Sequence, residues 1–129
     1  MKVIMNLPVA PSDNVMVERE GDLLRVYFDF KKEVVKDEEG NEVEEPVQHS
    51  CQNVDIVGRH GYGEIVGAII NDQYSPDEVQ AIMFNNELAK DTDSDITDDK
   101  RAEYLAEYRA LQAFRAHAKE VAAKVVEII

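Results

Sequence analysis

The sequence predicts an α+β fold in which an N-terminal antiparallel β-sheet of three to five strands is followed by two short helices and a long C-terminal amphipathic helix. In the first half, apolar and polar residues alternate at the period of a β-strand. In the second half, apolar residues recur every three or four positions, which is the period of a helix. The length suits a single domain, 1–129, with a β-rich part, 1–57, and a helical part, 62–129.

The β-rich part contains a predicted hairpin at residues 15–30, with its turn at Glu20, Gly21 and Asp22. Its second strand places one alternating set on the buried face: Leu24, Val26, Phe28 and Phe30. The other face receives Arg25, Asp29 and Lys31, with Tyr27 among them. A further tight hairpin turn is predicted at Gly40–Asn41, with Pro46 near the end of the returning strand, and residues 52–58 suggest one more short strand.

The helical part opens with a short helix that contains Ile65, Val66, Ala68, Ile69 and Ile70. Ser75, Pro76 and Glu78 then form the signature of a capping box, which predicts a second helix. Its inward-facing residues are expected to be Val79, Ile82, Met83 and Leu88. Residues 97–129 contain neither Gly nor Pro, so the spacing predicts one helix about 50 Å long, capped at Asp95 or Thr97.

This last helix carries an apolar stripe that resembles the seam of a coiled coil. The stripe follows alternating steps of four and three residues through Tyr104, Tyr108, Leu111, Arg115, Ala118, Ala122, Val125 and Ile129, and only Arg115 interrupts it. Such a stripe serves either contact with a partner or a second copy, or packing of the helix across its own sheet. The first alternative predicts an interface made of Tyr104, Tyr108, Leu111, Phe114, Ala118, Val121, Ala122 and Val125.

The charge of the chain restricts its partners. The formal net charge is −13, and so acidic a surface repels nucleic-acid phosphates and anionic membranes. We therefore expect no direct nucleic-acid binding and no membrane association. The single cysteine excludes an internal disulfide framework, and no segment approaches the roughly 18 apolar residues of a membrane span. These observations favour a cytoplasmic protein, or a component of a virion assembled there.

The acidic run "DTDSDITDDK" is the strongest candidate for a metal site, with Asp91, Asp93 and Asp95 at the first, third and fifth positions of a calcium-binding loop. The sixth position, which requires Gly, is Ile96, and the twelfth, which requires a chelating Glu, is Ala102. The run is more typical of an acidic linker that caps the following helix. No metal or other cofactor is therefore expected.

Two other segments contain residues of the kinds that form chemical sites. His49, Ser50 and Cys51 place a nucleophile beside a base, but no orienting group accompanies them. The segment "GRHGYGE" places glycines before a helix, but its spacing matches neither the dinucleotide fingerprint nor the P-loop. The residues therefore predict a protein that is not an enzyme.

Two segments, "YGEIVGAIINDQYSPDEVQAIMFNNELAKD" and "EYLAEYRALQAFRAHAKEVA", resemble small uncharacterised proteins of prophages and mobile elements in gut Bacteroidetes. The resemblance covers the C-terminal half of the chain. It implies a phage-related role, such as a virion accessory protein or an assembly factor, and implies no catalytic residues. We therefore expect a non-enzymatic structural or assembly protein whose C-terminal helix contacts a second copy or another phage or host protein. The alternative is an acidic inhibitor that mimics nucleic acid and binds a basic host protein.

Overall fold

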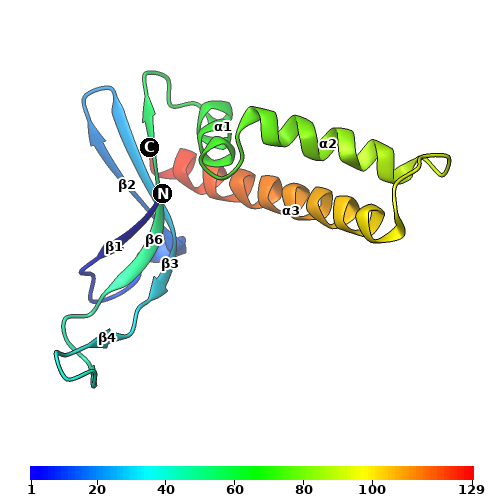
Figure 1. The fold of residues 1–129 in the computed structure, drawn as a ribbon. Helices are drawn as coiled ribbons and strands as arrows, with labels where there is room; N and C mark the ends of the chain where they lie inside the picture. Colours follow the sequence, from blue (N-terminus) through cyan, green and yellow to red (C-terminus); the bar gives the residue numbers. More distant parts are fainter.

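The computed structural model describes all 129 residues and confirms an N-terminal antiparallel sheet followed by three helices (Figure 1). The main sheet has four antiparallel strands, in the spatial order β1 (Lys2–Met5), β6 (His49–Val57), β3 (Leu23–Lys32) and β2 (Val15–Glu20). A separate two-stranded sheet consists of β4 (Val35–Lys36) and β5 (Glu42–Val43). A short 3-10 helix, η1 (Ser12–Asn14), precedes β2, and the helices are α1 (Tyr62–Gln73), α2 (Pro76–Lys90) and α3 (Asp98–Ile128).

The β2–β3 hairpin forms as the turn residues predict, and Gly21 adopts a φ of +59° that a residue without Cβ adopts freely. Leu24, Val26 and Phe28 are buried beneath the helices. The alternation breaks after Phe28, where a bulge shifts the register with β6 and Asp29 takes a φ of +58°. The prediction that Asp29 lies on the face away from the core is wrong, because its carboxylate bonds to α3.

Strand β6 is the main correction to the sheet. Its nine residues pair with β1 on one side and β3 on the other, so it is a central strand instead of a short addition. His49, Ser50 and Cys51 are all buried, so this part of the strand lacks the alternation of apolar and polar residues by which a strand is recognised in a sequence. In the β4–β5 hairpin only Gly40 has a positive φ, +84°, so Asn41 does not share the predicted left-handed turn.

The helix starts follow the predicted capping residues. The Ser75 hydroxyl accepts a hydrogen bond from the Glu78 amide at 3.1 Å, and the Glu78 carboxylate accepts one from the Ser75 amide at 3.2 Å. The Thr97 hydroxyl caps α3 by accepting from the Lys100 amide at 3.2 Å. On α2 the inward prediction is wrong for Met83, whose side chain is 44% exposed. No helix is both long enough and apolar enough to cross a bilayer.

The core lies where the C-terminal half of α3 and the helix α1 cover one face of the sheet. It contains Val15 of β2, five residues of the central strands β3 and β6, two isoleucines of α1 and four residues of α3. These twelve residues are Val15, Leu24, Val26, Phe28, Val54, Ile56, Ile65, Ile69, Ala118, Val121, Ala122 and Val125. The N-terminal half of α3 instead runs antiparallel to α2, and the two extend together away from the sheet (Figure 1). The long helix therefore both folds back on its own sheet and projects from it.

Candidate functional site

The projecting helical hairpin is the candidate functional site. We call it the arm and define it as α2, the tip loop 91–97 and the N-terminal half of α3 up to Arg115 (Figure 1). Two helices can cover only one side of each other, so large apolar side chains remain partly uncovered. On α2, Phe84 is 65% exposed and Met83 is 44% exposed. On α3, Tyr104 and Tyr108 are half-buried.

The structure divides the predicted interface residues into two groups. Five lie inside the chain's own fold, with at most 3% of each side chain exposed: Leu111, Ala118, Val121, Ala122 and Val125. These five residues therefore belong to the core, and the prediction that they contact a partner is wrong. Phe114 is half-buried and packs against the core, and its ring lies tilted against the Tyr74 ring with 5.7 Å between the ring centroids. Tyr104 and Tyr108 are half-buried on the arm.

The tip loop is ordered by its own hydrogen bonds. The Asp91 carboxylate accepts from the Asp93 amide at 2.9 Å, and the Ser94 Oγ atom lies 2.9 Å from both the Leu88 and the Asp91 carbonyl oxygens, which share its one hydrogen. The Arg101 guanidinium donates to the Asp91 carbonyl at 3.0 Å and to the Ala89 carbonyl at 2.6 Å. No group of three carboxylate, imidazole or thiol side chains is placed to hold a metal ion, so Asp91, Asp93 and Asp95 do not converge on one.

A groove of about 330 Å³ lies at the base of the arm, where three helices meet. Its lining comes from α1, from the first turns of α2 and from α3: Gly67, Ile70, Asn71, Pro76, Val79 and Arg115. Arg115 is the residue that interrupts the apolar stripe, and it is half-buried without a hydrogen bond or ion pair to any residue of the chain. The interruption at Arg115 is visible in the sequence, but the groove also depends on α1 and α2, whose positions the periodicity of α3 does not predict.

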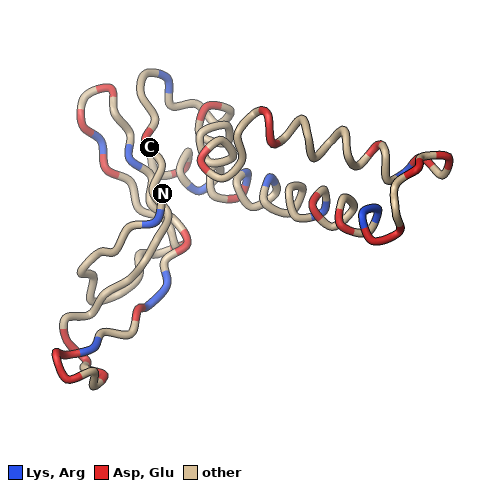
Figure 2. Tube along the Cα trace, viewed as in Figure 1, with Lys and Arg blue, Asp and Glu red and all other residues tan.

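Charge is distributed unevenly between the tip of the arm and the part of α3 that approaches the sheet (Figure 2). The tip, residues 91–99, holds five carboxylates and no basic residue. Residues 109–124 of α3 hold one carboxylate and four basic side chains: Arg109, Arg115, Lys119 and Lys124. A second acidic cluster occupies the loop between β4 and β5, at the other end of the molecule (Figure 2).

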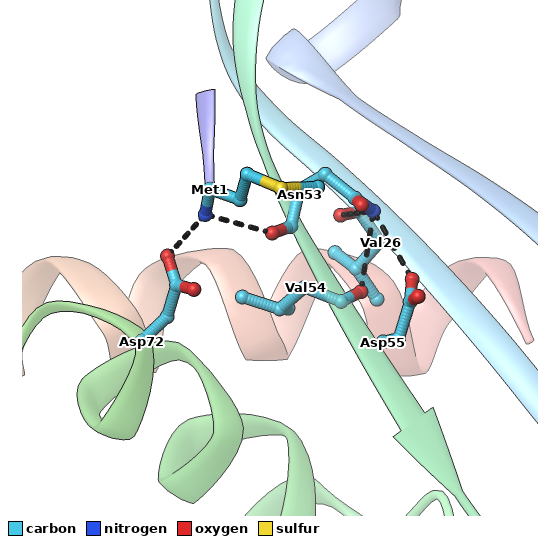
Figure 3. Close-up of polar contacts among 6 residues, drawn as sticks. All are labelled: Met1, Val26, Asn53, Val54, Asp55 and Asp72. Carbon is cyan, nitrogen blue, oxygen red and sulfur yellow. Dashed lines mark hydrogen bonds and ion pairs between the residues drawn. The ribbon is translucent and has the colours of Figure 1, made fainter. Parts of the chain in front are cut away.

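A polar junction fastens α1 to the sheet (Figure 3). The amino group of Met1 pairs with the Asp72 carboxylate of α1 and donates to the Asn53 carbonyl of β6 at 3.1 Å. The Asn53 amide nitrogen donates to the Val26 carbonyl and to the Asp55 carboxylate, at 3.3 Å each. These bonds satisfy a buried amide and hold β1, β6, β3 and α1 together, so the junction has a structural role.

The remaining sequence candidates are also structural. The His49 Nδ1 atom lies 3.1 Å from the Leu7 carbonyl, and burial raises the pKa of the Cys51 thiol, which lowers its thiolate fraction. In "GRHGYGE", the His60 Nε2 atom contacts the Asp22 and Ile56 carbonyls at 2.7 and 3.1 Å. The Glu64 carboxylate lies over Gly61 at the N-terminus of α1, where an anion would bind.

A scan of protein-family models and searches of curated proteins and solved structures find no match to this chain.

Proposed function

We propose that this protein is a phage-related structural or assembly protein, without catalytic activity of its own, that acts through protein–protein contacts of its arm. The observation that carries this proposal is the projection of a two-helix arm beyond the sheet with apolar side chains on its uncovered sides. The resemblance of residues 62–91 and 103–122 to prophage proteins supports the phage context.

The exposed side chains of the arm are of the kinds that make contacts. Aromatic residues and Met are enriched in protein interfaces, and burying a Phe or Met side chain contributes roughly 1.5–3 kcal/mol. Phe84 and Met83 supply such area on α2, and Tyr104 and Tyr108 supply it on α3. The arm is also elongated, so a partner can contact it along its length without disturbing the sheet.

The test is the molar mass in solution, measured by size-exclusion chromatography with light scattering at low and moderate salt. We expect a dimer or larger assembly that the double variant Met83→Asp/Phe84→Asp weakens at least tenfold. The matched control is Val57→Asp, because Val57 is an apolar side chain on the sheet that is 75% exposed. A protein that stays monomeric at every concentration contradicts self-association through the arm.

A second candidate function is an acidic inhibitor of a basic host protein, and the two carboxylate clusters at opposite ends of the molecule favour it (Figure 2). Its complex would be held by surface charge, which salt screens. We would measure binding to a basic nucleic-acid-binding protein, for example a bacterial histone-like protein, at low and raised salt. Binding that is unaffected by salt, or by replacing acidic residues of both clusters, contradicts this candidate.

A further inference from the structure

We propose that the groove at the base of the arm binds the tip of the arm of a second copy, so that two chains pair antiparallel through their arms. This inference rests on the proposed function and names its partner. It joins two features of one chain that lie too far apart to meet within it. Thr97 at the tip and Arg115 at the base are separated by about 27 Å, because an α-helix rises about 1.5 Å per residue.

The groove combines apolar walls with an unpaired cation. Ile70, Pro76 and Val79 supply the apolar lining, and Gly67 leaves one wall open, since a Cβ built there meets no atom within 4 Å. The half-buried Arg115 guanidinium has no carboxylate partner within the chain, although the chain has 27 Asp and Glu residues. A guanidinium in such a setting is suited to bind a carboxylate through paired hydrogen bonds.

Lys119 extends this positive region. It follows Arg115 by four residues and therefore lies one turn farther on the same side of α3. It is exposed and forms no hydrogen bond or ion pair within the chain. Arg115 at the groove and Lys119 one turn beyond it thus present adjacent positive charges, in a protein whose net charge is −13.

The tip has the complementary chemistry. The carboxylates of Asp93 and Asp95 accept no hydrogen bond within the chain, so both are free to receive donors from another molecule. Ile96 follows them directly and is half-buried, so part of its side chain is available to apolar walls. An apolar side chain beside carboxylates is complementary to an apolar groove that is lined by Arg115, with Lys119 one turn farther along α3.

Symmetry then selects the orientation. In an antiparallel pair related by a two-fold axis near the middle of the arm, each tip reaches the other copy's base, so the same contact forms twice. A parallel pair would place five tip carboxylates against five others, which repel one another. Pro76, Val79 and Met83 recur at three- and four-residue spacing, so they lie on one side of α2 and the pairing covers Met83 as well.

The experiment measures the dimer dissociation constant by light scattering and sedimentation equilibrium at low salt. We expect at least tenfold weaker dimers for Arg115→Glu/Lys119→Glu and for Asp93→Lys/Asp95→Lys, and restored affinity when the four changes are combined. The matched control is Glu38→Lys/Glu39→Lys, which alters the charge equally in the β4–β5 loop. Because the tip and control variants both reduce the overall repulsion between acidic chains, weakening by the tip variant alone identifies a specific contact.

Circular dichroism verifies that each variant is folded. A second, independent experiment mixes Asp95→Cys and Lys119→Cys chains under mild oxidation, where we expect a disulfide between the two chains. The native Cys51 does not compete, because it is only 2% exposed. A dimer that ignores both charge reversals and forms no such disulfide overturns this inference and leaves self-association by the arm standing. A wild-type protein that remains a monomer overturns both.

Discussion

The His117 Nε2 atom of α3 lies 2.7 Å from the Asp29 Oδ1 atom of β3. This contact joins the C-terminal half of the long helix to the bulge that interrupts the sheet, and the His117 ring also lies 6.3 Å from the Phe28 ring. Asp29 reaches the helix because the bulge gives it a φ of +58°, which breaks the strand's alternation. A single irregular residue therefore helps to position α3 on the sheet.

The first prediction concerns this contact. We expect Asp29→Asn to leave stability nearly unchanged, because Asn tolerates a positive φ and retains a hydrogen-bonding oxygen. We expect Asp29→Val to cost about 2–3 kcal/mol, because it combines the lost hydrogen bond with a β-branched side chain in a left-handed conformation. Urea denaturation followed by circular dichroism measures both. Equal losses for the two variants would show that the positive φ at the bulge is unimportant.

The second prediction compares two alanines of α3 that differ in their surroundings. Ala118 is fully buried against the sheet, whereas Ala113 is exposed on the outer side of the same helix. We expect Ala118→Leu to lower the free energy of unfolding by about 1–3 kcal/mol, because it overfills the core. We expect Ala113→Leu to change it by less than about 0.5 kcal/mol. Similar melting temperatures for the two variants would contradict the placement of α3 on the sheet.

The third prediction concerns the pH dependence that follows from Cys51. Burial raises the pKa of its thiol, so the unfolded chain loses this proton at a lower pH than the folded chain does. The contribution to stability is therefore complete below the ordinary thiol pKa of about 8.5 and is lost as the pH rises through the raised value. We expect Cys51→Ala to flatten the fall in stability as the pH rises above the ordinary thiol pKa of about 8.5. Denaturant titrations at several pH values check this, and identical slopes for both proteins would refute it.

Local signals in the sequence anticipated much of the fold. The Ser75 and Glu78 capping box, the Thr97 cap and the turn at Gly21 depend on residues within a few positions of one another, so short sequence patterns identify them. The existence of the long helix was equally predictable, because a run without Gly or Pro and with a continuous apolar stripe favours one helix. The fold class, α+β with a sheet before the helices, follows from these local features.

The sequence by itself thus determined the order of a β-rich part and a helical part, the hairpin of β2 and β3, and the starts of α2 and α3. Only the tertiary structure decided what covers the apolar sides of the elements. The C-terminal half of the α3 stripe packs against the sheet, and the N-terminal half packs against α2. The tertiary structure also decided that Arg115 stands at a groove formed with α1 and α2, and that Asp29 turns toward His117. The physical reason is that hydrophobic burial is non-directional, so an apolar stripe specifies that a surface must be covered but does not specify by which element.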